Sequence, residues 1–195
     1  MANKRIDFIS FDEFQKLYKA AKDKKLKLAM LLGFGSGLRI SEIIGFQRKF
    51  KHKTDKLTKE LTLLPDDSKI PPLTADKVDL KNHQIRIDDA KGGKWRVTVT
   101  SLALKEDMLK LLPIEIPRRT LQYQFDALCK KVLDKKMSFH ILRHGFGNYM
   151  VNVLKLPITM VQGYMGHSDI SMTAMYSKAN PEAAINEAWK AMGGE

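Results

Sequence analysis

Helical hydrophobic periodicity on both sides of one strand-like stretch is the feature that most constrains how this chain can fold. Ser10 and Glu13 form the sequence pattern of a capping box, and apolar residues then recur at helical spacing as far as residue 21. An apolar run over 26–34 follows, and a short helical segment over 38–46 comes after three glycines at alternate positions. The chain before residue 47 is therefore predicted to be mainly helical.

The strand-like stretch lies between residues 85 and 99. Apolar and polar residues alternate over 85–87 and again over 95–99, and Lys91 between them is followed by two glycines. Alternation on either side of a glycine turn is typical of a β-hairpin. The sequence therefore predicts a small antiparallel unit with Lys91 at its tip.

Beyond residue 101 the pattern is helical again. It predicts helices over 102–112, 120–133, 138–154 and 159–165, with breaks near Pro113, Pro117 and Pro157. An N-cap asparagine, a first-turn proline and an acidic residue then open a last helix over 180–192. We expect one domain over 1–195 of the α+β class, mainly α-helical, with a small antiparallel β-sheet.

The periodicity is lost between residues 47 and 72. A basic stretch comes first, and a turn-rich stretch with prolines and aspartates follows it. We interpret 47–72 as an inserted loop or a small inserted hairpin. Its lysines either are solvated and mobile or contact phosphate groups.

The net charge of the chain favours a polyanionic partner. Lys and Arg number 34 against 22 Asp and Glu, a formal net charge of +12 at pH 7, and the isoelectric point is near 9.7. A field of this sign attracts nucleic acid. Basic proteins are nevertheless common, so the motifs have to identify the function.

Several classes of protein are excluded by what the chain contains. Cys129 is its one cysteine, which excludes an intrachain disulfide and a multi-cysteine zinc site. The first ten residues lack an apolar core, and no apolar run is long enough to cross a bilayer, so we expect neither a signal peptide nor a membrane span. A cytoplasmic protein is expected.

Two arginines and a lysine supply part of the chemistry that cleaves a phosphodiester bond. Cleavage requires a nucleophile, neutralisation of charge on the nonbridging oxygens and a proton for the leaving oxygen. Arginine donates two parallel hydrogen bonds and stays charged, so Arg39 and Arg143 are predicted to clamp the phosphate. Lysine loses its proton more easily than arginine when it is desolvated among cations, so Lys91 is predicted to protonate the leaving 5′ oxygen.

Two histidines and a tyrosine complete the set. His140 and Arg143 are three positions apart and share one face of a predicted helix. Imidazole titrates near neutrality, so His140 is assigned to help deprotonate Tyr176 and His167 to bind the phosphate, although the sequence does not rank these two roles. A phenol nucleophile forms an ester that preserves the bond energy, so neither a cofactor nor a metal is expected.

Each of these residues also has a structural interpretation. Arg39 could be a surface residue paired with Glu42 one turn further on. His140 and His144 could pack within a helix, and Tyr176 could be a core aromatic residue. The alternate glycines do not match a dinucleotide or Walker pattern, so nucleotide binding is not expected.

In this order the motifs resemble the catalytic boxes of the tyrosine recombinases, the phage integrase family. The matching stretches are Gly37-Leu38-Arg39-Ile40-Ser41-Glu42, the Lys91 hairpin, His140-x-x-Arg143-His144, Met165-Gly166-His167 and Tyr176. The resemblance implies a mostly helical catalytic domain that forms a 3′-phosphotyrosine and a free 5′ hydroxyl on double-stranded DNA. It also implies a homotetramer in the synaptic complex and a final segment, 180–195, that docks into a neighbouring protomer.

The chain also departs from the family pattern. Such recombinases usually carry an N-terminal DNA-clamping domain, which we expect to be absent because the catalytic pattern starts near residue 10. The 47–72 insertion lies where the family normally moves quickly to the hairpin, and Met165 replaces the usual leucine. Two alternatives to a site-specific recombinase or integrase stay open, a type IB topoisomerase and a non-catalytic DNA-binding protein on the same scaffold.

Overall fold

The computed structural model describes residues 8–47, 50–54, 61–65, 69–88 and 95–167 of the 195-residue chain. The helices in these ranges are α1 (Phe11–Ala20), α2 (Lys24–Gly35), α3 (Ile40–Ile44), α4 (Glu106–Leu109), α5 (Arg118–Leu133), α6 (Ile141–Asn148) and α7 (Ile158–Met165). The strands are β1 (Phe46–Gln47), β2 (Phe50–Thr54), β3 (Leu61–Pro65), β4 (Lys69–Ile70), β5 (Val78–Asp79), β6 (Gln84–Asp88) and β7 (Trp95–Val99). This α+β, mainly helical architecture with small antiparallel sheets is the predicted one.

The predicted capping box starts α1. The Ser10 hydroxyl accepts from the Glu13 N–H at 3.1 Å, and the Ser10 N–H donates to the Glu13 carboxylate at 3.0 Å. These two bonds satisfy donors that the first turn of a helix would otherwise leave unpaired. The apolar face of α1 then packs on α2, where the Phe14 and Phe34 rings stack with centroids 4.2 Å apart.

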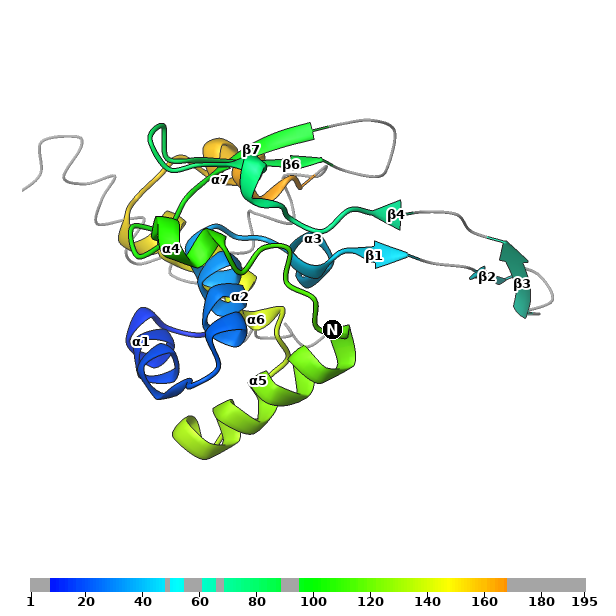
Figure 1. Cartoon of the computed structure of the whole chain (residues 1–195), viewed down its shortest axis with the longest axis horizontal. Helices are drawn as coiled ribbons and strands as arrows, with labels where there is room; N and C mark the ends of the chain where they lie inside the picture. Colours follow the sequence, from blue (N-terminus) through cyan, green and yellow to red (C-terminus); the bar gives the residue numbers. More distant parts are fainter. Residues whose placement is uncertain (1–7, 48–49, 55–60, 66–68, 89–94, 168–195) are drawn as a thin grey trace, which may run out of the picture.

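Helix α2 is the centre of the hydrophobic core. Its residues from Leu28 to Phe34 are all buried, so the helix is apolar on every side instead of amphipathic. In Figure 1 it lies between α1 and α6, with α5 below it. A Cβ added at Gly33 would lie 3.2 Å from the Leu142 side chain, so α2 and α6 approach closely there.

The predicted hairpin strands form an antiparallel sheet with strand order β5-β6-β7. Ile85 and Ile87 of β6 point into the core, and Trp95 of β7 is 63% exposed. Thr98 is buried and donates from its hydroxyl to the Ser36 carbonyl at 2.8 Å, which ties β7 to the end of α2. The predicted tip, including Lys91, lies outside the described residues.

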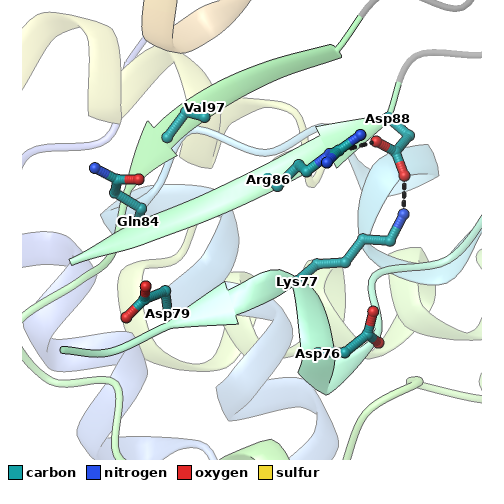
Figure 2. Close-up of a pocket in the computed structure, with 7 residues that line it drawn as sticks. All are labelled: Asp76, Lys77, Asp79, Gln84, Arg86, Asp88 and Val97. Atoms are coloured by element: carbon teal, nitrogen blue, oxygen red, sulfur yellow. Dashed lines mark hydrogen bonds and ion pairs between the residues drawn. The ribbon is translucent and has the colours of Figure 1, made fainter. Parts of the chain in front are cut away.

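A cavity of about 370 Å³ lies on the outer face of β5 and β6. Figure 2 shows charged side chains of both signs along it, among them Lys77, Arg86 and Asp88. Asp88 pairs with both of these cations, which balances charge within the cavity. None of the predicted catalytic residues that the structure describes, Arg39, His140, Arg143 and His167, lines this cavity.

The 47–72 insertion forms paired strands. Strand β1 pairs with β4, and β2 pairs with β3, both antiparallel, and these ladders extend away from the helical body in Figure 1. Within the described residues, this strand pairing corresponds to the hairpin of the two interpretations.

Three predicted helices differ from the observed ones in extent. In the predicted 102–112 helix only Glu106–Leu109 is helical, because 101–104 forms a turn that leaves Leu102 fully exposed. The 38–46 helix is shortened to Ile40–Ile44, since Arg39 is extended and Gly45 has a φ of 79°. The 138–154 helix changes after Asn148 to a π-helical turn, η2 (Tyr149–Val153).

The predicted last helix over 180–192 lies outside the described residues. Cys129 is buried in α5.

In the part of the chain that the structure describes, no helix is both long and apolar enough to cross a membrane. No group of three or more possible metal-binding side chains occurs among these residues either.

Candidate active site

The C-terminal end of α7 meets a cluster of three arginines, Arg39, Arg96 and Arg143, which we call the arginine cluster. Three consecutive carbonyl oxygens, those of residues 164, 165 and 166, each accept a hydrogen bond from a different one of them. The pairs are Arg96 Nε with Tyr164 at 3.0 Å, Arg143 Nη2 with Met165, and Arg39 Nη2 with Gly166 at 3.3 Å. A helix end carries unpaired carbonyls and partial negative charge, so these arginines cap α7.

Arg143 is the most buried member of the cluster. It lies on α6 with 1% of its surface exposed, and its Nη1 donates to the Gly37 carbonyl at 2.5 Å. One guanidinium therefore joins α6 to the segment before α3 and to the end of α7. A buried charge with such partners is fixed in position, because removing either carbonyl would leave polar groups unsatisfied.

Two glycines make the close approach of these segments possible. Gly37 has a φ of 70°, and a Cβ there would lie 2.6 Å from Phe146 Cδ1. Gly166 has a φ of 62°, and its Cβ would lie 2.7 Å from Arg96 Cδ. Both positions combine the left-handed backbone that favours glycine with a lack of space for a side chain. Glycine therefore lets the chain turn shortly before Arg39 and again at the end of α7.

Arg39 lies at the N-cap of α3 with 35% of its side chain exposed. Its Nη1 donates to Glu42 Oε1 at 2.8 Å, and its backbone N–H donates to Glu42 Oε2 at 2.7 Å. The structural alternative of an Arg39–Glu42 pair is thus correct as a contact. It does not make Arg39 an ordinary surface residue, because the Glu42 side chain is only 5% exposed and Arg39 also reaches the end of α7.

Glu42 holds a second arginine as well. Arg96 of β7 binds it through two parallel hydrogen bonds, Nη1 to Oε1 at 2.9 Å and Nη2 to Oε2 at 2.8 Å. Burial alone would raise the pKa of Glu42, but the bonds and charge of Arg96, with the charges of Arg39 and Arg143, hold it at about 2. The carboxylate is therefore ionised at neutral pH.

The histidines lie beside the arginine cluster. His140 directly precedes α6, and its ring meets the His144 ring edge-on with centroids 4.7 Å apart. His167 directly follows Gly166, and its backbone is held by Gln162, which accepts from the His167 N–H at 3.2 Å and donates to its carbonyl at 3.1 Å. His167 is thereby fixed just beyond the carbonyls that the arginines bind.

Reduced hydration and nearby positive charge keep these histidines neutral. Partial burial, with the neighbouring His144 and Arg143, lowers the pKa of His140 to about 4. Partial burial, with Arg143 and Arg39, lowers the pKa of His167 to about 4. Each imidazole is therefore unprotonated near pH 7 and can accept a proton or donate one hydrogen bond.

Four of the six predicted site residues, Arg39, His140, Arg143 and His167, are brought together by the fold. Lys91 and Tyr176 lie outside the described residues. Sequence reasoning missed Glu42 and Arg96 as members of the site. The signal for Glu42 was a carboxylate within the apolar segment Ile40–Ile44, which needs a partner once it is buried. Arg96, between Trp95 and Val97, carried no comparable signal.

An arrangement of this kind can bind an oxyanion. Positive charge from α3, α6 and β7 converges on one helix end, and most of its hydrogen-bond partners are neutral carbonyls. Neutral histidines beside it can exchange protons. Groups that neutralise an oxyanion and groups that move protons are two of the three requirements for phosphodiester cleavage.

Several known proteins are similar to this chain in sequence or fold. The phage integrase family model matches residues 114–183, a segment that contains His140, Arg143, His167 and Tyr176. The tyrosine recombinase XerA of Saccharolobus solfataricus is 27% identical over 191 residues, which cover 92% of this chain and 55% of the relative. This chain is thus similar to the phage integrase, or tyrosine recombinase, family, through the family model over 114–183 and through relatives that align over most of its length.

Another curated protein and two solved structures are also similar to this chain. The tyrosine recombinase XerC-like protein of Caldanaerobacter subterraneus is 24% identical over 93% of this chain and 52% of its own length. The chain spans about half the length of the curated relatives it matches. Among solved structures, the XerA recombinase has a TM-score of 0.64 at 19% identity, covering 96% of this chain and 66% of that one. The catalytic domain of bacteriophage HP1 integrase has a TM-score of 0.58 at 19% identity, covering 93% and 95%.

Proposed function

We propose that this chain is the catalytic domain, over 1–195, of a site-specific DNA recombinase that breaks and rejoins strands through a 3′-phosphotyrosine at Tyr176. The observation that supports the proposal best is the convergence of Arg39 and Arg143 on adjacent carbonyls, directly before His167. Residues far apart in the sequence are thereby gathered at one place, as a phosphate site requires.

In the proposed reaction the Tyr176 oxygen attacks the phosphorus atom and its proton passes to His140. The bond to the 5′ oxygen breaks, and that oxygen takes a proton from Lys91, while Tyr176 becomes esterified to the 3′ phosphate. Rejoining is the reverse, with a 5′ hydroxyl as the nucleophile. Neither ATP nor a metal enters the balance.

The cations stabilise the charge that grows on the phosphate during attack. Arg39 is the more exposed arginine and is assigned to a nonbridging oxygen. Arg143 is buried, so its charge acts through a medium of low dielectric constant and is weakly screened. His167 is assigned a hydrogen bond to the same phosphate.

Double-stranded DNA is the proposed partner. Solved relatives include the XerH site-specific recombinase bound to difH substrate and a lambda integrase dimer bound to a COC′ core site. The net charge of +12 suits such a partner, and the 47–72 hairpin is proposed to add backbone contacts. A tetramer on two DNA sites, with residues 180–195 docked in a neighbouring protomer, completes the proposal.

The proposal is tested with nicked suicide DNA substrates, from which cleavage cannot be reversed. The wild-type chain should form a covalent adduct on a denaturing gel, and Tyr176→Phe should form none. Tyr123→Phe is the matched control, because Tyr123 is a strongly exposed tyrosine of α5, and it should keep the adduct. No adduct from the wild-type chain on a range of DNA sequences would favour the non-catalytic DNA-binding alternative.

A topoisomerase is separated from a recombinase by a second assay. Relaxation of supercoiled plasmid by the monomer, without sequence preference and without joining of two duplexes, would indicate a type IB activity. The proposed recombinase should instead form synapses and join two specific duplexes.

A further inference from the structure

Arg96 is the member of the arginine cluster that the proposed mechanism leaves without a role. Its side chain is only 12% exposed, and its Nη1, Nη2 and Nε atoms all have protein acceptors. A guanidinium engaged in this way is poorly placed to bind a phosphate itself. Its effect on the site has to pass through the groups that it holds.

The group that it holds most firmly is Glu42. Each carboxylate oxygen of Glu42 accepts two hydrogen bonds, one from Arg96 and one from Arg39. The carboxylate is therefore shared between two arginines. Two guanidinium groups and one carboxylate leave a net charge of +1 on the set.

We infer that Arg96 is a positioning residue that shares Glu42 with Arg39 and so keeps positive charge on Arg39 for the phosphate. This inference rests on the proposed function, in which Arg39 binds a nonbridging oxygen. Without Arg96, a single carboxylate would face a single guanidinium and Arg39 would lie in a neutral ion pair. An incoming phosphate would then have to compete with Glu42.

Burial makes this sharing effective. Glu42 and Arg96 both lie largely out of water, where the interaction between charges is several times stronger than in solvent. A buried carboxylate with one partner would also turn fully toward it, since an ionised oxygen without hydrogen bonds is costly there. Because Arg96 donates hydrogen bonds to both Glu42 oxygens, Arg39 does not have to satisfy the carboxylate alone.

Arg96 also sets the position of the turn that leads to His167. Its Nε donates to the Tyr164 carbonyl at 3.0 Å, and a Cβ on Gly166 would lie only 2.7 Å from its Cδ. The hairpin strand β7, Glu42 of α3 and the end of α7 thus meet at one side chain. A change in the charge of Arg96 should therefore alter the electrostatic environment of Arg39. A change in its shape should alter the position of His167.

The test measures binding of inorganic phosphate near neutral pH from the backbone amide NMR signals of Arg39 and His167. Arg96→Gln and Arg96→Lys both lose the parallel pair of hydrogen bonds to Glu42, but only the glutamine loses the charge. Phosphate affinity should fall about tenfold in Arg96→Gln and by no more than about threefold in Arg96→Lys. Adding Glu42→Gln to Arg96→Gln should restore affinity, because no carboxylate then competes for Arg39.

Other outcomes overturn the inference. Equal losses of phosphate affinity in Arg96→Gln and Arg96→Lys would show that Arg96 acts through shape alone. A double variant that binds phosphate no more tightly than Arg96→Gln would show the same. Absence of phosphate-dependent shifts in the wild-type chain would remove the oxyanion from this cluster. Thermal unfolding of each variant, followed by circular dichroism, shows whether Arg96→Gln stays folded; if it does not, the folded double variant and Arg96→Lys decide between the two explanations.

Covalent adduct formation with suicide DNA separates this inference from the proposed function. Slow adduct formation by Arg96→Gln, recovered when Glu42→Gln is added, supports both. Undiminished adduct formation by Arg96→Gln overturns the inference alone. In a third outcome, phosphate affinity is highest in the wild-type chain, lower in Arg96→Lys and lowest in Arg96→Gln, while neither the wild-type chain nor any variant forms an adduct. That combination overturns the proposed function and leaves the charge sharing intact.

Discussion

Arg39 and Gly166 are 127 positions apart in the sequence, yet the Arg39 guanidinium donates a hydrogen bond of 3.3 Å to the Gly166 carbonyl. The bond joins the start of α3 to the end of α7. Neither segment alone contains the candidate site, so the proposed phosphate clamp can form only after the two halves of the chain have packed together. Changes that disturb this packing should therefore reduce stability and DNA cleavage together.

Gly37→Ala should destabilise the fold by about 3 kcal/mol, because alanine is strained at a φ of 70° and its Cβ would clash with Phe146. Gly163→Ala is the matched control. A Cβ at Gly163 meets nothing within 4 Å, and alanine favours the helix, so stability should rise by up to about 1 kcal/mol. Urea denaturation measures both. Equal effects of the two substitutions would contradict this account of Gly37.

Arg143→Met should lower the free energy of unfolding by roughly 2–5 kcal/mol, since it leaves the carbonyls of Gly37 and Met165 without their guanidinium donor. Arg86→Met is the control, because it makes the same substitution at a different arginine. Arg86 is largely exposed and pairs with Asp88, so its replacement should cost no more than about 1 kcal/mol. Chemical denaturation of both variants at one pH checks the difference. A cost below about 1 kcal/mol for Arg143→Met would contradict the assigned contacts.

The fold should lose stability between about pH 6.5 and pH 4. The folded-state pKa values of His140 and His167 are lowered to about 4, whereas unfolded histidines titrate near 6.5. The unfolded chain therefore binds more protons in this window, and the contribution of the neutral histidines is complete above it. Denaturation midpoints across the range should fall with acid, and His140→Gln or His167→Gln should each flatten the slope. A midpoint that rises with acid would refute this expectation.

DNA binding should be weak and should depend strongly on salt, because phosphate contacts release counterions. Replacing Lys51 and Lys53 of the 47–72 hairpin by serine should reduce the slope of log affinity against log salt concentration by about one for each phosphate that is no longer neutralised. Lys130→Ser and Lys135→Ser serve as controls, since these lysines already pair with acidic residues. Fluorescence anisotropy at several salt concentrations measures the slopes. Affinity that does not change between low and moderate salt would exclude backbone-dominated binding.

Lys91→Ala should slow cleavage of an ordinary DNA strand by about a hundredfold or more, as expected when a general acid is removed. Cleavage of a strand with sulfur at the bridging 5′ position should change far less, because sulfur leaves without a proton. Lys81→Ala, at an exposed lysine between β5 and β6, should affect neither substrate. Single-turnover rates on the two substrates make the comparison. Equal slowing of both would remove Lys91 from that role.

Local sequence signals predicted the helices and strands better than their ends. The capping box at Ser10 located the start of α1, because the two hydrogen bonds involved depend only on neighbouring residues. The 102–112 helix was wrong in extent, since helical periodicity does not reveal that Leu102 lies in an exposed turn. Tertiary packing, absent from a local pattern, decided that region.

The same limit explains the site. Arg39, His140, Arg143 and His167 could be named from motifs, because motif order carries the family pattern. Arg96 could not, since an arginine in an alternating strand is usually a solvated side chain. Its pairing with Glu42 depends on tertiary contact between β7 and α3, and no short stretch of sequence encodes that contact.

The carbonyl groups at the end of α7 have one more consequence. Arg39 is anchored both by the Glu42 carboxylate, which would release it on protonation, and by a backbone carbonyl. Backbone carbonyls neither carry a full charge nor titrate, so the hydrogen bonds that Arg39 and Arg143 donate to them are the same in acidic and neutral solution. The carbonyl groups at the end of α7 thus bind the arginines without titrating themselves. Among the described residues of the site, acid sensitivity is confined to the side chains of the histidines and, near pH 2, of Glu42.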